Sequence, residues 1–118
     1  MRFLSKRSVL EELERAKASK TKQWRDNLPT WCPGCGHFTG LHGLYEAVEN
    51  LKIPQKDFVV VSGIGCSGRF PFFIKGFGLH SLHGRALPVA TGIKIANPAL
   101  TVVVVGGPEV ACPCADVP

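Results

Sequence analysis

Two short apolar runs stand out in the hydrophobic pattern of the chain. The first, F-V-V-V at 58–61, breaks at once into the small-residue segment S-G-I-G-C-S-G at 62–68, and the second reads L-T-V-V-V-V at 100–105. Continuous β-branched runs of this length, without polar alternation, are typical of parallel strands that are buried on both faces. The pattern therefore predicts two strands, at 58–61 and 100–105.

Apolar residues at helical spacing predict three helices. Apolar positions among Glu and Arg predict a short amphipathic helix over about 5–19. A second helix is predicted over 38–50, from the repeat of Phe38, Leu41, Leu44, Tyr45, Val48 and Leu51. The third is predicted over 87–97, because Pro88 suits a first turn and Asn97-Pro98 stops a helix.

The order strand, loop, helix, strand predicts a βαβ unit in an α/β fold. Its crossover should be right-handed, which would place Gly106-Gly107 beside the loop at 63–68, at the same edge of a parallel sheet. Ligands of open α/β sheets bind outside the carboxyl ends of strands, and glycines there let backbone N–H groups approach an anion. We therefore expect a cofactor site at these two strand ends.

Composition is that of a globular chain with one modest core. The 118 residues are 45% apolar and 19% charged, with a net charge of +5. Residues 1–30 hold eight Lys/Arg against four Asp/Glu, so the excess lies in an amino-terminal arm. This arm has no nucleic-acid motif, and no apolar run anywhere in the sequence approaches the roughly 20 residues needed to span a bilayer. We expect a cytoplasmic protein without nucleic-acid or membrane partners.

The cysteines are the main candidates for chemistry. Five cysteines in a cytoplasmic chain do not suit a disulfide framework, and Cys32-Pro33-Gly34-Cys35 forms a C-x-x-C. Pro33 and Gly34 favour a tight turn that aims two sulfurs at one point. By itself this spacing fits a metal or cluster ligand pair, a redox dithiol or two unrelated thiols.

Several further residues have both a functional and a purely structural interpretation. His37 and His42 are candidate metal ligands because histidine commonly binds metals, but a capping or surface role is favoured for both. The aromatic cluster at 70–73 could cover a cofactor, and core packing is favoured. His83-Gly84-Arg85 precedes a predicted helix, where it could bind an anion or form a surface turn.

Three motifs in order resemble a known family. W-C-P-G-C-G at 31–36, G-I-G-C-S-G-R at 63–69 and the segment L-H-G-R to V-V-G-G at 82–107 are similar to the thiamine diphosphate-binding beta subunit of the 2-oxoacid:ferredoxin oxidoreductases, most of all the 2-oxoglutarate type. The resemblance covers about 31–107. It implies a doubly wound α/β domain, of which this chain holds a part. The helix predicted at about 5–19 would form an arm at the amino terminus of this domain.

The resemblance also implies roles for individual residues. The residues that match the family's cofactor site are Ile64, Gly65, Cys66 and Ser67 in the loop, with His83 and Gly84 lining the same pocket. The residues that match three of the four thiolates around a 4Fe-4S cluster are Cys32, Cys35 and Cys66. Cys66 would therefore bring cluster and thiamine diphosphate close together.

The implied activity is oxidative decarboxylation of a 2-oxoacid, with 2-oxoglutarate favoured, to an acyl-coenzyme A. Electrons would pass through the cluster to ferredoxin, magnesium would hold the diphosphate, and an alpha subunit would complete the active site. An alternative from another class is a small zinc-binding interaction domain, with a fourth ligand from Cys112, Cys114 or His80. A dithiol redox protein is a third interpretation.

The chain departs from the family after Gly107. Pro108 stands where the family has the first aspartate of G-D-G-D, a magnesium ligand, and the fourth cluster cysteine would lie further on. We expect three parts: an amino-terminal helix and linker at 1–30, a partial thiamine diphosphate-binding domain at 31–107, and an aberrant tail at 108–118. The tail is best explained by a shifted reading frame or truncation, and we expect no turnover by this chain alone.

Overall fold

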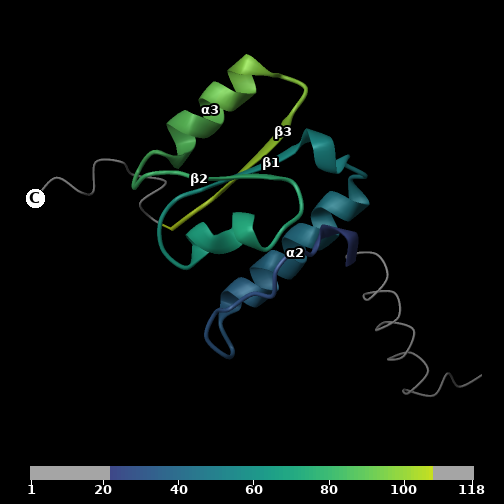
Figure 1. The fold of residues 1–118 in the computed structure, drawn as a ribbon, viewed down its shortest axis with the longest axis vertical. Helices are drawn as coiled ribbons and strands as arrows, with labels where there is room; N and C mark the ends of the chain where they lie inside the picture. Colours follow the sequence, from purple (N-terminus) through teal and green to yellow (C-terminus); the bar gives the residue numbers. More distant parts are fainter. Residues whose placement is uncertain (1–21, 108–118) are drawn as a thin grey trace, which may run out of the picture.

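The computed structural model describes residues 22–107 (Figure 1). Its elements in order are η1 (Lys22–Trp24), α2 (Gly36–Asn50), η2 (Gln55–Asp57), β1 (Phe58–Ser62), η3 (Ser67–Phe72), β2 (Phe77–His80), α3 (Ala86–Ala96) and β3 (Thr101–Val105). The helices predicted at 38–50 and 87–97 and the strands predicted at 58–61 and 100–105 are confirmed. The helix predicted at 5–19 and the tail at 108–118 lie outside the described residues. No helix in the described part of the chain is long and apolar enough to cross a membrane.

The described strands form a parallel sheet in the order β2-β1-β3. In its register, Val60 of β1 lies opposite Gly78 on one side and Val103 on the other. All five residues of β1 are buried, because neighbouring strands cover both edges and helices cover both faces. The sheet is thus built around the first of the two apolar runs.

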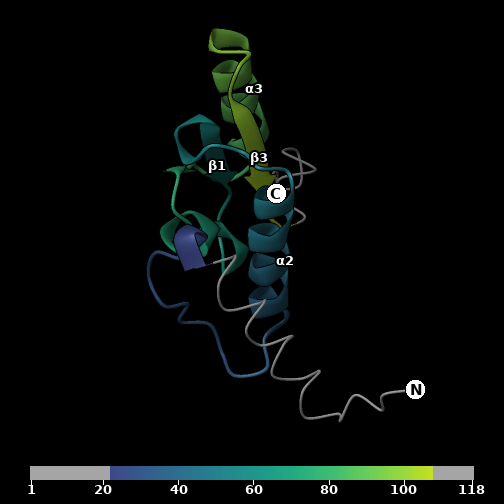
Figure 2. The same cartoon turned by 90° about the vertical axis from the view of Figure 1, so that its right-hand side faces the viewer.

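The two faces of the sheet are covered by different parts of the chain. Phe58 and Val60 point into a core shared with α2 and η3, while Val59 and Val61 pack with α3. Figures 1 and 2 show α2 and α3 on opposite sides of the strands. This layering is that of a doubly wound α/β fold, so the predicted fold class is confirmed.

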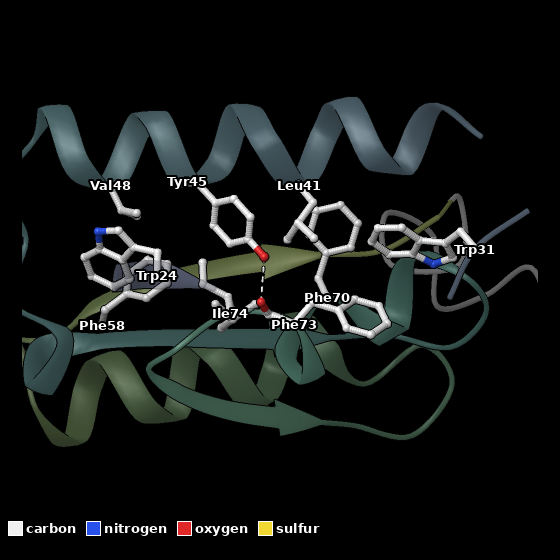
Figure 3. Packing of buried hydrophobic residues seen from close by; sticks show 10 residues of the cluster. Trp24, Trp31, Leu41, Tyr45, Val48, Phe58, Phe70, Phe73 and Ile74 are labelled. Carbon is white, nitrogen blue, oxygen red and sulfur yellow. Dashed lines mark hydrogen bonds between the residues drawn. The ribbon is translucent and has the colours of Figure 1, made fainter. Parts of the chain in front are cut away.

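The core beneath α2 is rich in aromatic side chains (Figure 3). Trp24 and Trp31 lie at the two ends of the row of labelled residues, and Tyr45 lies between them. The Tyr45 hydroxyl donates a 2.6 Å hydrogen bond to the carbonyl of Phe73. In the predicted cluster at 70–73, Phe70 and Phe73 are buried, as expected, whereas Phe72 is exposed.

Strand β2 was not predicted, and it changes the expected βαβ order. It lies between the glycine loop and α3 in sequence, on the far side of β1 from β3. All four of its residues are exposed, with Phe77 at 61%, and Gly78 separates its two apolar residues, so no continuous apolar run marks it. The strand predicted at 100–105 packs against a core on each face, with Val103 and Val105 on one side and Val102 and Val104 on the other, but it is less deeply buried than expected. In the described residues β3 pairs only with β1, and its five residues are half-buried.

Residues before position 31 also contribute to the core. Trp24 is 2% exposed, its ring packs edge-on against Phe58, and its carbonyl accepts a hydrogen bond from the Lys75 N–H. Arg25 forms an isolated antiparallel bridge with Ile74. The packed core therefore includes side chains on both sides of the boundary predicted at residue 30.

Candidate functional site

The carboxyl ends of the three strands meet at one edge of the sheet. The Gly63 N–H, just after β1, donates a 3.0 Å hydrogen bond to the carbonyl of Val105, the last residue of β3. On the other side, the Ser81 N–H, just after β2, donates a 2.9 Å hydrogen bond to the carbonyl of Ser62. The expectation that the glycine loop begins beside the end of the second apolar strand is confirmed.

The loop at 63–68 is tightly closed and turns its middle outward. The Gly68 N–H donates a 3.0 Å hydrogen bond to the carbonyl of Gly65, whose φ of +90° favours glycine. A Cβ on Gly65 would meet no atom within 4 Å, whereas one on Gly68 would overlap the Gly63 carbonyl oxygen. Ile64, Gly65 and Cys66 are exposed as a result, and the loop has open space in front of it.

A serine and a histidine, which sequence reasoning did not connect, close this loop. The Ser62 hydroxyl donates to the Gly68 carbonyl at 2.7 Å, and His80 Nδ1 lies 2.9 Å from the same oxygen and 3.0 Å from Ser62 Oγ. Because a carbonyl oxygen only accepts, we assign the ring proton to Nδ1. The signal in the sequence was a polar residue at the carboxyl end of β1, Ser62, and of β2, His80.

The C-x-x-C forms the tight turn that was expected. The Cys35 N–H donates a 3.0 Å hydrogen bond to the Cys32 carbonyl, and Gly34 has a φ of +77°. Proline second and a positive-φ glycine third are typical of a type II turn. Cys35 is half-buried at the position before α2, and its sulfur lies 3.0 Å from Nδ1 of His37. His37 therefore contacts a cysteine rather than being only a surface residue.

The turn and the glycine loop are held together by one side chain. Trp31 directly precedes Cys32, and its indole N–H donates a 2.8 Å hydrogen bond to the carbonyl of Cys66. Cys32, Cys35 and Cys66 are all free thiols, and Cys32 and Cys66 are exposed. The structure thus brings the two cysteine motifs side by side, with donors whose chemistry fits a thiophilic metal or an iron-sulfur cluster.

The three thiols do not form a closed ligand set in this structure. Within residues 22–107, no group of three or more Cys, His, Asp or Glu side chains is placed so that it could hold a metal ion. Cys112 and Cys114, considered as ligands in the zinc alternative, lie outside the described residues. His80, the third candidate there, has Nδ1 engaged by the loop.

A pocket of about 540 Å³ opens beside the glycine loop at the start of α3. The residues that line it are Ile64, Leu79, His80, Ser81, Leu82, Arg85, Pro88 and Val89. His83 and Gly84 belong to the turn between two of these residues, closed by a 3.0 Å bond from the Arg85 N–H to the Leu82 carbonyl. The positive end of α3 and the Arg85 guanidinium favour an anionic ligand here.

Several known proteins are similar to this chain. Residues 54–108 match the family model described as thiamine pyrophosphate enzyme, C-terminal TPP binding domain. The chain is 53% identical over 88 residues to 2-oxoacid:ferredoxin oxidoreductase 2, subunit beta, of Aeropyrum pernix, which covers 75% of this chain and 27% of that protein. It is 44% identical over 77 residues to the 2-oxoglutarate oxidoreductase subunit KorB of Mycobacterium tuberculosis, covering 65% and 21%.

A solved structure shares both fold and sequence with the chain. The 2-oxoglutarate:ferredoxin oxidoreductase from Magnetococcus marinus, with 2-oxoglutarate, coenzyme A and succinyl-CoA bound, superposes with a TM-score of 0.73 at 50% identity, over 75% of this chain and 31% of that one. The chain therefore spans less than a third of the length of these relatives. On its motifs, its fold and these matches, the chain belongs to the family of 2-oxoacid:ferredoxin oxidoreductase beta subunits.

Proposed function

We propose that this chain is the part of a beta subunit that binds thiamine diphosphate at its strand ends and supplies three ligands of a 4Fe-4S cluster. The whole enzyme would oxidatively decarboxylate a 2-oxoacid to an acyl-coenzyme A and pass the electrons to ferredoxin. 2-Oxoglutarate is favoured as the substrate, because it appears in the names of KorB relatives and of the similar solved structure. An alpha subunit would be the obligate partner.

The observation that carries this proposal is the contact between the two cysteine motifs. Residues 32 and 66 are far apart in sequence, yet the Trp31 indole bonds to the Cys66 backbone, so the turn and the glycine loop adjoin. Cysteine side chains turn about a single χ1 torsion among staggered rotamers. Ligation would require Cys32, Cys35 and Cys66 to turn toward one point, with the fourth thiolate coming from outside residues 22–107.

The glycine loop has the features that a diphosphate cofactor needs. Ile64, Gly65, Cys66 and Ser67 would hold the cofactor on one side, and the His83-Gly84 turn on the other. Open space in front of Gly65 lets the backbone approach a ligand closely, and Arg85 adds positive charge. Bound there, thiamine diphosphate supplies an electron sink for decarboxylation, and the cluster accepts electrons. The residues of the loop and of the turn would bind and orient the cofactor.

Magnesium is included in the proposal because a diphosphate commonly binds through this cation. Within residues 22–107, no side chain is assigned as its ligand. Coenzyme A and ferredoxin are proposed as further partners of the whole enzyme, since the similar solved structure is a ferredoxin oxidoreductase with coenzyme A bound.

Anaerobic reconstitution of the chain with ferrous iron and sulfide tests the proposal. The expected product is brown and contains iron and acid-labile sulfide, and Cys66→Ser is expected to lose most of both. One tightly held zinc ion without cluster absorbance would instead support the zinc-binding domain. A reversible Cys32–Cys35 disulfide with no bound metal would support the dithiol redox protein.

A further inference from the structure

We propose that Trp31 is a positioning residue that fixes the Cys32–Cys35 turn against Cys66, and thereby sets the spacing of three cluster ligands. The role in spacing cluster ligands rests on the proposed function, whereas the position of the turn relative to Cys66 concerns only this chain. The family resemblance assigns no role to Trp31.

The indole ring of Trp31 is held firmly in the core. Its exposed fraction is 7%, and its ring centroid lies 5.2 Å from that of Phe70 and 5.0 Å from that of Phe73. Phe38 packs edge-on at 5.5 Å and His37 lies at 5.3 Å, so aromatic rings from both α2 and η3 surround it. Figure 3 shows Trp31 at one end of this aromatic row. A ring packed in this way has little freedom to move its N–H group.

The atom that Trp31 holds is fixed from a second direction as well. The Cys66 carbonyl accepts the indole N–H at 2.8 Å and also the Arg69 N–H, at 3.3 Å, in the first turn of η3. Two donors from different segments thus define the position of the Cys66 backbone. Trp31 is the residue before Cys32, and the turn from Cys32 to Cys35 is closed by a hydrogen bond. The same indole therefore also sets the position of the backbone that carries the Cys32 and Cys35 side chains.

Trp24 provides a matched control in the same chain. Its indole N–H also donates one hydrogen bond, to a carboxylate oxygen of Glu49 at 2.9 Å, and its ring is also buried. It lies at the opposite end of the aromatic row from Trp31 (Figure 3). Changing either tryptophan to phenylalanine removes one indole hydrogen bond and keeps an aromatic ring, but only the bond of Trp31 ends on a cysteine motif.

The first test uses the metal-free full chain and oxidative trapping. Wild type, Trp31→Phe and Trp24→Phe are treated with diamide, and disulfides that join Cys66 to Cys32 or Cys35 are identified by peptide mapping. We expect Trp31→Phe to slow this trapping about fivefold to tenfold, because about one hydrogen bond of constraint is lost. Trp24→Phe should trap at the wild-type rate, although thermal unfolding should show that both variants lose similar stability.

The second test uses the reconstituted cluster. Iron release to a chelator is expected to be about fivefold to tenfold faster from Trp31→Phe than from wild type, and unchanged in Trp24→Phe. If wild type forms no cluster but trapping depends on Trp31, the proposed function fails and the positioning role stands. If trapping in Trp31→Phe equals that of wild type, or if wild type gives no such disulfide, the positioning role is overturned.

A second replacement keeps the test decisive if Trp31→Phe does not fold. Trp31→His retains a ring N–H, but its smaller ring does not reach as far as the indole. It is therefore also expected to trap more slowly than wild type. A folded Trp31→His that traps at the wild-type rate would equally overturn the positioning role.

Discussion

At the scale of single residues, two glycines should respond to alanine in opposite ways. A Cβ on Gly68 would overlap the Gly63 carbonyl oxygen and lie 2.9 Å from Cε1 of His80, so the loop at the strand ends would have to open. Gly43, exposed in α2, has nothing within 4 Å of its virtual Cβ. We expect Gly68→Ala to cost about 1–3 kcal/mol or more, and Gly43→Ala to add about 0.4–1 kcal/mol. Urea unfolding measures both, and a neutral Gly68→Ala would contradict the closed loop.

The buried tyrosine should make stability depend on pH in the alkaline range. Burial raises the pKa of Tyr45 above its ordinary value of 10.0, with smaller opposing and reinforcing effects from Arg25 and Asp26. The protonated form is thus favoured in the folded state. Its contribution is fully present below pH 10.0, and is lost as pH rises from there through the raised folded pKa.

Comparing wild type with Tyr45→Phe isolates this effect from the titration of lysines. The variant should be about 1 kcal/mol less stable at neutral pH, because the Phe73 carbonyl loses its donor. Above pH 10.0 the difference between the two proteins should shrink as wild type loses stability. Denaturant midpoints measured from pH 8 upward check this, and a gap that widens with pH would contradict the direction of the shift.

Contacts between residues that are close in sequence were predictable, whereas contacts that depend on the register of paired strands were not. The Cys32–Cys35 turn follows from proline and glycine between the cysteines. The contact between Ser62 and His80 depends on β2 pairing with β1 so that these two residues lie opposite each other. No local spacing encodes that pairing, because a four-residue segment does not specify which strand it joins or in which register.

At the scale of elements, the end of α2 contains a strained residue that can be relieved. Lys52 has a φ of +51°, and its N–H bonds to the Glu49 carbonyl while the Ile53 N–H bonds to the Val48 carbonyl. This pair of bonds is a Schellman motif, in which glycine usually takes the left-handed position. Lys52→Gly should therefore stabilise the protein by about 0.5–1 kcal/mol.

The matched control for this change is a lysine only four positions further on. Lys56 is also exposed, but it lies in η2 and has no left-handed backbone. Lys56→Gly should be neutral or destabilising by up to about 1 kcal/mol, since it only adds flexibility to the unfolded chain. Thermal melts of both variants distinguish a local relief of strain from a general effect of losing a lysine charge.

The elements that were predicted correctly are those whose apolar pattern matches their burial. α2 places one face on the sheet, so helical periodicity identified it, and β1 is buried on all sides, so its continuous apolar run identified it. β3 has the same β-branched composition as β1 but is half-buried, because its second edge is not covered by any described strand. Its β-branched composition indicated that it is a strand. Its exposure depends on whether another strand pairs with its second edge, and the sequence of β3 does not specify that.

At the scale of the whole molecule, the core is larger than the segment that carries the family motifs. Resemblance to the family begins at Trp31, and this is where the predicted domain began. The hydrophobic core extends to residues before Trp31. Trp24 fills the space between α2 and β1, at the end of the sheet away from the glycine loop (Figure 3). The site at one end and this anchor at the other are joined by a single aromatic core.

Replacing this anchor should therefore destabilise the whole domain. Trp24→Ala removes a ring that is 2% exposed and packs on Phe58 at 5.4 Å, so we expect a loss of about 3–5 kcal/mol. Leu28→Ala is the control from the same arm, since Leu28 is 87% exposed and should change stability by less than about 0.5 kcal/mol. Equal, small effects in denaturant unfolding would mean that residues before 31 form a separate arm. A large difference between the two variants would extend the domain to residue 24.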